Sequence, residues 1–400
     1  MSCALLAGAP ALADGSGGSD DPTGKRDLHP QHTSGGERGW LAPRKTSGAR
    51  TAVPRRSDGV ARSVVPGVTF AEWTQTDERG PIRAHLLAID LEAPGVRLDY
   101  ADPGAVRGTA TVPQILARDK AVAGVNGDFY DIGSTGAPLG IGKDLQRGII
   151  HGRVSGWNNA FYLDARGVPQ IGDLPMRFGV PGHTGIKISG INQPIVPADS
   201  VGVYTAAWGK NAGFTVTEGQ TKGIRVVQLL KGKVVGIYPR LKAGKPIKGQ
   251  LLIGRGAGAR MLKELKLGQR VKGVRSRVVG DPRMVITGDK LLVDEGLNNA
   301  KNDTVMHPRT AVGIDRDTGE VLLLVVDGRS STSRGYTMVE MADLMMTLGA
   351  DEALNLDGGG SSTMVIRVAG GARRVVNTPS DGFLRHVSNA LEVTYKAPTK

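Results

Sequence analysis

Residues 353–364 have the sequence ALNLDGGGSSTM, in which an apolar run delivers one carboxylate, Asp357, into three consecutive glycines and then three hydroxyl residues. Three glycines in a row cost backbone entropy, so a chain keeps them where the backbone takes positive φ or where a ligand approaches bare backbone. A flexible hairpin turn is the alternative, but a turn needs only one or two glycines and does not explain the carboxylate and the hydroxyls. The stretch therefore indicates a functional loop at the end of a strand.

The sequence before this loop predicts a strand, a helix and a second strand. Residues 320–326 are almost wholly apolar, which is typical of a strand covered on both faces, and they lead to Asp327. Thr337 and Glu340 then form a capping-box pattern at the start of a segment with apolar residues at helical spacing. If the two strands are parallel neighbours, Asp327 and Asp357 lie at the same carboxyl edge of the sheet.

A second polar loop follows another short apolar strand. Residues 126–131, NGDFYD, bring Asn126 and Asp128 to the end of that strand and continue into a glycine-rich run. An Asn-Gly hairpin turn is the alternative. The polar run is longer than a hairpin requires, however, and this length is typical of a functional loop.

The remaining pattern predicts an α+β fold over residues 63–395, with a mixed β-sheet core and few helices. Short apolar segments alternate with turns that contain glycine or proline, and the first strand is expected at residues 64–73. Residues 200–280 are rich in lysine and are expected to form an inserted β-rich subdomain, which includes a strand at 267–278.

The N-terminal region has a different composition. Residues 1–13 contain a short apolar run ending in Ala-Leu-Ala, which resembles a secretory signal without its positively charged start; a truncated signal and a chance apolar tail both stay open. Residues 14–62 carry few apolar positions, and we expect them to form a disordered linker. The only cysteine, Cys3, lies in the signal-like segment, so we expect a secreted, extracellular bacterial protein without disulfides.

The charge balance points to an anionic partner. The chain has a net charge of +13, of which residues 1–65 hold +3, with nine Lys and Arg against six Asp and Glu. Aromatic residues are only 4% of the chain, and no basic helix or finger spacing is present, which argues against nucleic acid. No stretch beyond the first residues approaches the roughly twenty apolar residues of a membrane span. A phosphate-bearing polymer or a sugar phosphate fits this balance.

Four segments together resemble the phosphodiester glycosidase family: residues 126–131, 307–315, 326–365 and 377–391. The family includes N-acetylglucosamine-1-phosphodiester alpha-N-acetylglucosaminidase and bacterial proteins related to exopolysaccharides. The resemblance covers the chain from about residue 60 to residue 395. It implies an enzyme that hydrolyses the bond between the anomeric carbon of a sugar and a phosphodiester oxygen.

The resemblance and the chemistry of this reaction select the candidate site residues. A phosphate oxygen leaves more readily than an alkoxide, so groups that hold the phosphate should matter more than a strong acid. The candidate catalytic residues are Asp357, Asp128 and Asp327. Guanidinium groups, backbone amides and neutral polar side chains suit phosphate and sugar oxygens. The candidate binding residues are Asn126, Arg309, Thr310, Arg329, Asn355, Gly358, Gly359, Gly360, Ser361 and Arg385.

The expected substrate is a sugar-1-phosphodiester, such as N-acetylglucosamine-1-phosphodiester in a wall or extracellular polymer, or a phosphorylated polysaccharide. The reaction requires no cofactor, although the three acids could coordinate calcium, so the metal is unknown. One alternative is a non-catalytic module that binds phosphorylated polysaccharide. Another is a phosphodiesterase that breaks the bond between phosphorus and the aglycone oxygen.

Overall fold

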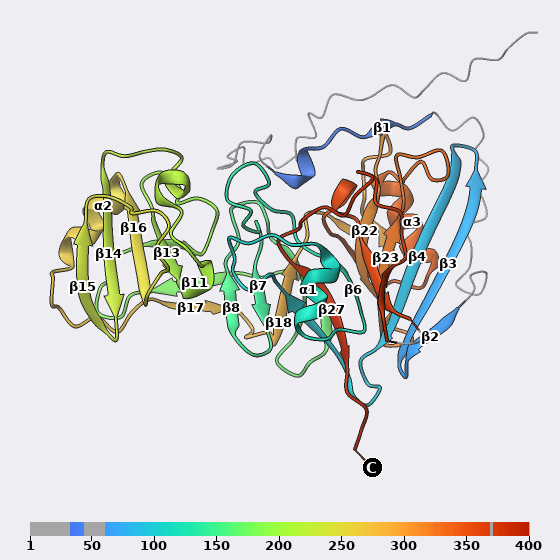
Figure 1. Cartoon of the computed structure of the whole chain (residues 1–400), viewed down its shortest axis with the longest axis horizontal. Coiled ribbons are helices and arrows are strands. Elements are labelled where there is room, and N and C mark those ends of the chain that lie inside the picture. Colours follow the sequence, from blue (N-terminus) through green and yellow to red (C-terminus); the bar gives the residue numbers. More distant parts are fainter. Residues whose placement is uncertain (1–32, 44–60, 369–370, 400) are drawn as a thin grey trace, which may run out of the picture.

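The structure, a computed structural model, describes residues 33–43, 61–368 and 371–399. The signal-like segment 1–13 and most of the predicted linker lie outside these residues. The described chain is β-rich, as expected, and its strands form several sheets. Figure 1 shows a large part that contains β3, β4, β22, β23 and α3, and a smaller part at the other end that contains β13 to β16.

The largest sheet has eight strands. Their order is β2 (Arg62–Val65), β3 (Val68–Asp77), β4 (Gly80–Asp90), β23 (Glu320–Val326), β22 (Arg309–Ile314), β24 (Glu352–Asn355), β19 (Leu291–Asp294) and β20 (Leu297–Asn298). A five-stranded sheet faces it. That sheet contains β26 (Arg373–Val375), β25 (Met364–Arg367), β6 (Ala123–Asn126), β27 (Ala390–Tyr395) and β5 (Val96–Ala101).

Strand β23 shows how the large sheet is buried on both faces. Val321, Leu323 and Val325 pack into the core that is shared with the five-stranded sheet. Leu322 and Leu324 point to the opposite face, into a second core that contains the helix α3 (Met338–Thr347). Side chains alternate between the faces of a strand, so a doubly covered strand must be apolar throughout. The predicted strand at 320–326 is therefore confirmed, and so is the prediction that it is covered on both faces.

The helix α3 begins as the sequence predicts. Thr337 accepts a hydrogen bond from the backbone N–H of Glu340, and the Glu340 side chain accepts one from the backbone N–H of Thr337. The other α-helices are short: α1 (Val112–Arg118) and α2 (Ala257–Met261). Short 3-10 turns are η2 (Ser34–Gly36), η4 (Ala206–Trp208), η5 (Gly213–Thr217), η6 (Leu262–Glu264) and η7 (Gly359–Ser361).

Two further five-stranded sheets lie between residues 142 and 287. One contains β10 (Pro169–Asp173), β9 (Asn159–Leu163), β18 (Met284–Thr287), β7 (Gly142–Asp144) and β8 (Gly148–His151). The other contains β12 (Ile188–Ile191), β13 (Val201–Thr205), β16 (Gln250–Arg255), β14 (Ile224–Leu230) and β15 (Lys233–Tyr238). The two-stranded pairs are β11 (Met176–Gly179) with β17 (Arg275–Val278), and β1 (Trp40–Leu41) with β21 (Val305–Met306). The limits 200–280 of the expected subdomain stay a prediction.

Several expectations about strands are wrong. The single strand at 64–73 is two strands, β2 and β3, because Pro66 lacks a backbone N–H and Gly67 turns the chain at φ +78°. The strand at 267–278 is reduced to β17, because Gly268 and Gly273 take positive φ. Strands β23 and β24 are parallel but are not neighbours, since β22 lies between them and is antiparallel to both.

A buried carboxyl, Glu392, beside a half-buried one, Asp99, generates a stability prediction in the five-stranded sheet. Glu392 on β27 lies directly opposite Asp99 on β5, and like charges at such positions are unfavourable. Burial raises the pKa of Glu392 to about 8 and that of Asp99 to about 7. A carboxyl whose pKa is raised by folding stabilises the protein least when it is ionised, so its contribution is lost as the pH rises through about 8.

We therefore expect Glu392→Gln to raise the melting temperature at pH 8.5 by roughly 2–4 °C and to change it little at pH 5. Calorimetry at both pH values measures this difference, and Glu92→Gln, an exposed carboxyl on the same part of the protein, is the matched control. An equal gain at both pH values would show that ionisation of Glu392 is not the cause.

Candidate active site

The ends of several strands meet at one edge of the large sheet. Strand β22 begins at Arg309, and the parallel strands β23 and β24 end beside it, just before Asp327 and Asp357. Strand β6 of the facing sheet ends at Asn126. Although β22 lies between β23 and β24, Asp327 and Asp357 still lie at the same edge of the sheet. The start of β22 lies at that edge too.

The side chain of Asn126 joins these strand ends. Its Nδ2 donates to the backbone oxygen of Asp357 at 2.6 Å. Its Oδ1 accepts from Thr310 Oγ1 at 2.9 Å and from the backbone N–H of Thr363 at 3.0 Å. Asn126 and Thr310, both candidates for substrate binding, are therefore buried and directed at the protein itself. Their contacts hold the two polar loops together.

Two buried carboxyls lie on either side of this joint. Asp128 and Asp357 are only 2% and 1% exposed. Oδ2 of Asp128 accepts from the backbone N–H of Gly140 at 2.8 Å, whereas its Oδ1 has no hydrogen-bond partner among the described residues. Neither carboxyl oxygen of Asp357 has a partner with hydrogen-bond geometry among these residues, although the hydroxyls of Ser361 and Ser34 lie near enough to favour its ionised form. Such free oxygens in a buried site are available to a substrate.

Burial shifts both of these carboxyls toward the protonated form. It raises the pKa of Asp357 to about 7, and the nearby hydroxyls of Ser361 and Ser34 oppose that rise in part. Burial raises the pKa of Asp128 still more clearly, and the negative charge of Asp357 adds to the effect. Two interacting acids with raised pKa values are a common arrangement for acid and base catalysis.

A third carboxyl of this group, Asp289, was not among the predicted residues. Asn355 Nδ2 donates to Asp289 Oδ1 at 2.7 Å, and burial raises the pKa of Asp289. Its negative charge also acts on both Asp128 and Asp357. The signal in the sequence is weak but present: Gly288 and Asp289 follow the apolar strand β18, as Asp and Gly follow β23 and β24.

Two predicted arginines and a glycine amide bind a carboxylate at the mouth of the site. Arg329 Nη1 donates to Glu37 Oε2 at 2.7 Å, and the backbone N–H of Gly360 reaches the same oxygen at 3.3 Å. Arg385 Nη1 binds the other oxygen, Oε1, and Arg385 is also paired with Asp381. These groups form an anion site whose occupant is a side chain of the protein itself.

The glycine run permits this approach. Gly359 has φ +59°, and a Cβ atom there would collide with Oε2 of Glu37. A Cβ atom on Gly360 would collide with the guanidinium of Arg385. At Gly358 it would lie 2.8 Å from the backbone oxygen of Pro308. A side chain at any of the three glycines would therefore collide with a neighbouring atom. At Gly359 and Gly360 that atom belongs to the anion site.

Glu37 belongs to residues 33–43, which we call the strap. Its first part pairs with the second polar loop: Ser34 and Tyr130 exchange hydrogen bonds of 3.0 and 3.1 Å. Its last part forms β1, which pairs with β21. Figure 1 shows this dark blue segment lying along the large part of the protein. The predicted disorder of residues 14–62 is therefore wrong for the strap, because its backbone is paired at both ends.

Arg309 is a buried cation at the same edge. Its Nε donates to the backbone oxygen of Tyr336 at 3.0 Å, and its Nη2 donates to that of Val305 at 3.3 Å. No ion pair joins it to a carboxylate of the described chain. Burial lowers the pKa of Arg309 to about 10 and that of the neighbouring His307 to about 2, so His307 is neutral at physiological pH. Nδ1 of His307 accepts a hydrogen bond from Arg329 at 2.9 Å.

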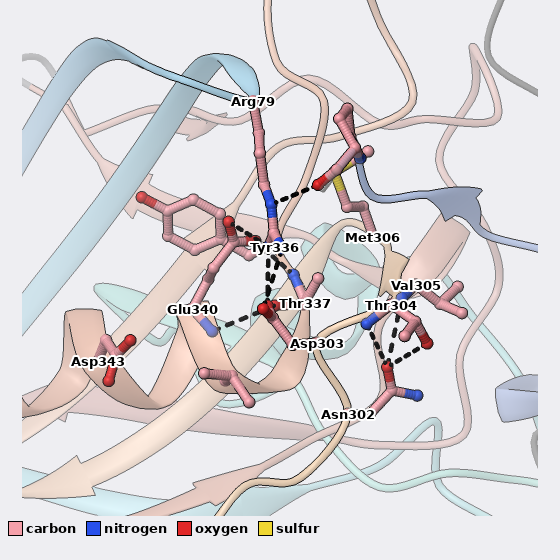
Figure 2. Close-up of polar contacts among 12 residues, drawn as sticks. Arg79, Asn302, Asp303, Thr304, Val305, Met306, Tyr336, Thr337, Glu340 and Asp343 are labelled. Carbon is pink, nitrogen blue, oxygen red and sulfur yellow. Dashed lines mark hydrogen bonds and ion pairs between the residues drawn. The ribbon is translucent and has the colours of Figure 1, made fainter. Parts of the chain in front are cut away.

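A network of ion pairs supports the two carbonyl groups that hold Arg309. Figure 2 shows Arg79 reaching both Asp303 and Glu340, at 2.7 and 3.0 Å. Asp303 also accepts from the Thr337 hydroxyl at 2.8 Å. The segment before β21 and the start of α3 are thereby tied together. These contacts hold in place the two backbone segments whose carbonyl groups, at Val305 and Tyr336, bind Arg309.

The remaining predicted residues have different environments. Asp327 accepts from the backbone N–H of Thr378 at 2.9 Å and contacts His85 Nε2 at 3.3 Å, so both of its oxygens are engaged by the protein. Oδ1 of Asn355 and Oγ of Ser361 are buried without a partner among the described residues. An open cavity of about 560 Å³ is lined by Arg385 and Arg107, among other residues.

The described residues also bear on metal and membrane. No three His, Cys, Asp or Glu side chains within them are grouped so as to hold a metal ion. Calcium stays a prediction from the sequence. No helix in the described part of the chain is both long enough and apolar enough to cross a membrane.

Comparison with known proteins finds a family match over slightly less than half of the chain. Residues 201–394 match the family model described as phosphodiester glycosidase. The resemblance drawn from the sequence is therefore confirmed over these residues, whereas the segment 126–131 lies outside the match.

Relatives and solved structures agree with this match to different extents. An uncharacterized prophage-derived protein of Bacillus subtilis is 38% identical over 91 residues, which are 23% of this chain and 13% of that protein. The N-acetylglucosamine-1-phosphodiester alpha-N-acetylglucosaminidase of Bos taurus is 47% identical over 62 residues, which are 16% of this chain and 11% of that enzyme. The chain thus spans a small part of the length of these relatives. A crystal structure of a Burkholderia pseudomallei protein shares the fold, with a TM-score of 0.68 and 20% identity over 90% of this chain and 100% of that chain.

The contacts of Asn126 generate a prediction about stability. Asn126→Ala leaves the backbone oxygen of Asp357 and the N–H of Thr363 without their side-chain partner in a buried site, so we expect the free energy of unfolding to fall by roughly 3–5 kcal/mol. Urea denaturation measures the change, and Asn158→Ala, at an exposed asparagine, is the control. A loss below about 1 kcal/mol would show that the joint is not important for stability.

Proposed function

We propose that this chain, whose residues 201–394 match the phosphodiester glycosidase family, hydrolyses the bond between a sugar and the phosphate of a sugar-1-phosphodiester. One observation carries the proposal: the anion site of Arg329, Arg385 and the Gly360 amide holds a carboxylate beside buried acids that have free oxygens. A carboxylate and a phosphate diester each present two anionic acceptor oxygens on one atom, which guanidinium groups can bind together. Glu37 therefore marks the place proposed for the phosphate.

The proposed roles of the acids follow from their pKa values. Asp357, with a pKa of about 7, is ionised in a large fraction of molecules at neutral pH and acts as the nucleophile or the base at the anomeric carbon. Burial raises the pKa of Asp128 well above its usual value and so favours the protonated form, which can give a proton to the departing oxygen. The C–O bond breaks, water supplies the new hydroxyl, and the phosphate leaves bound to Arg329 and Arg385. Because phosphate leaves readily, its binding contributes more than the proton.

The neutral polar atoms fit the sugar. Oδ1 of Asn355 and Oγ of Ser361 are buried beside Asp357 and lack partners in the described chain, so they can accept and donate hydrogen bonds to sugar hydroxyls or an N-acetyl group. The cavity beside Arg385 offers space for the aglycone. N-acetylglucosamine-1-phosphodiester in an extracellular polymer is the proposed substrate, and secretion is part of the same proposal. Asp327 is proposed to support the site through Thr378 and His85.

A panel of sugar-1-phosphodiesters that includes UDP-N-acetylglucosamine tests the reaction. Release of free sugar is expected, and hydrolysis in labelled water should place the label in the sugar. Label in the phosphate would assign a phosphodiesterase instead. Tight binding of a phosphorylated polysaccharide without any product would favour a non-catalytic module.

Substitution of the proposed nucleophile should separate catalysis from stability. Asp357→Asn is expected to lower kcat by about 10²–10⁴-fold, because it removes the carboxylate without changing the shape of the side chain. In the unsubstituted protein kcat/KM should rise with pH through about 7, as Asp357 ionises. At pH 8 the melting temperature of the variant should be equal to or higher than that of the unsubstituted protein. The reason is that the variant lacks a buried carboxyl whose ionisation is unfavourable. Unfolding of the variant would instead make Asp357 structural.

The strap should compete with the substrate. Glu37→Ala removes the carboxylate from Arg329 and Arg385, and we expect KM for a phosphodiester to fall by about tenfold while kcat stays similar. Steady-state kinetics measures both constants. Leu41→Ala, at an exposed position of the strap, is the matched control. An unchanged KM would show that the anion site is not the phosphate site.

A further inference from the structure

The positive charge of the chain is concentrated in one region. Residues 201–280, which we call the basic lobe, contain seventeen Lys and Arg against two acids, Glu218 and Glu264, a net charge of +15. The whole chain has a net charge of +13, so the rest of the protein is slightly negative. The excess of positive charge thus does not arise around the proposed active site.

The basic lobe presents its charge to solvent. It contains β13 to β16, α2 and η6, packed around a core of its own that includes Val203, Val227 and Leu252. Fifteen of its seventeen cations are exposed, and the exceptions are Arg225 and Arg255. Figure 1 shows these elements at the end of the molecule opposite to β3 and β4.

The two acids of the lobe cannot neutralise this surface. Glu218 is paired with Arg255, and Glu264 contacts His183. Among the described residues, these two pairs are the only ion pairs that include a residue of the lobe. Exposed like charges repel one another, and this cost is offset when a polyanion covers them.

One edge of the lobe brings cations from two segments together. The backbone N–H of Val234 donates to the oxygen of Gln269, and the N–H of Val271 donates to that of Gly232. Residues 266–272 therefore run along strand β15, with Lys233 opposite Arg270. Several cations gathered along one edge suit a chain of phosphates more than a single anion.

A second set of cations lies where the lobe joins the rest of the protein. Arg275 and Arg277 are exposed on β17, which pairs with β11. In Figure 1 this pair lies between the lobe and the larger part of the molecule. Exposed cations are thus present both at the β15 edge of the lobe and on the strand pair that joins the lobe to the larger part.

We propose that the basic lobe binds a phosphodiester-linked anionic polysaccharide and that the candidate active site acts on sugars of that polymer. This inference rests on the proposed function, which requires a sugar phosphodiester. A lobe that holds the polymer raises the local concentration of scissile bonds at a second site on the same chain.

The surface is less suited to nucleic acid. Tyr238 is the one exposed aromatic residue of the lobe, so successive bases have no stacking platform. The helix α2 spans only residues 257–261 and is too short to read a groove. The lobe therefore offers cations without the means of base recognition.

Binding by full-length protein tests the inference. The probe is a polymer of N-acetylglucosamine-1-phosphate, compared with phosphatidylglycerol vesicles and with a DNA duplex of matched charge. The Asp357→Asn chain is used for binding, so that the polymer is not degraded. Affinity should fall steeply with salt and should be highest for the sugar phosphate polymer.

A matched pair of variants assigns the binding to the lobe. The lobe variant carries Lys233→Gln, Lys266→Gln, Arg270→Gln and Lys272→Gln. The control carries Arg97→Gln, Arg118→Gln, Arg166→Gln and Arg374→Gln, which remove the same charge from exposed positions elsewhere. At low salt the lobe variant should bind the polymer about tenfold more weakly, and the control should lose less than about threefold.

Hydrolysis of a small sugar-1-phosphodiester is measured on the same two variants with Asp357 intact. Unchanged small-substrate hydrolysis with slower polymer hydrolysis in the lobe variant supports the inference. Equal loss of polymer binding in both variants overturns it, as does binding to vesicles or DNA that is at least as tight. If no small substrate is hydrolysed by either protein while the polymer still binds through the lobe, the proposed function fails and the lobe assignment stands.

Discussion

The hydrogen bonds of the Asn126 side chain are the constraint on which the candidate site depends. They connect the end of β6 in one sheet to the start of β22 and to the glycine loop after β24 in the other. Two sheets that pack face to face through apolar contacts can slide by small amounts, because such contacts have little directionality. A buried amide with three partners removes this freedom. Asp128 and Asp357 are therefore held in a fixed relation although they belong to different sheets.

The electrostatics of the site follow from that placement. The carboxyls are buried, which raises the pKa of Asp357, whereas the side chains of Arg329 and Arg385 remain partly exposed. Acids with free oxygens thus lie inside, and groups that bind an anion lie outside. A substrate with an uncharged sugar and a charged phosphate has the same polarity. This correspondence supports the proposed function.

The sequence predicted the parts of the fold that depend on local pattern. The apolar strand β23, the capping box of α3 and the acids after apolar strands are of this kind, because propensity and periodicity act over a few residues. Pairing between distant strands is not local, so the position of β22 between β23 and β24 could not be predicted. For the same reason the amide of Asn126 was assigned to the substrate. Glu37 was missed because one carboxylate in a weakly apolar segment looks like any solvated charge.

The place of β22 at the centre of the large sheet also bears on the order of folding. Strands β22 and β23 form a hairpin with a short turn, whereas β24 can join β22 only after the whole of α3 has been formed or looped out. Contacts between residues close in sequence have a small closure entropy and generally form first. We therefore expect the hairpin of β22 and β23 to form first and β24 to pair with its β22 edge afterwards. Asp357 reaches its position only when that strand has docked, so an incompletely folded chain holds its acids apart and has no active site to expose.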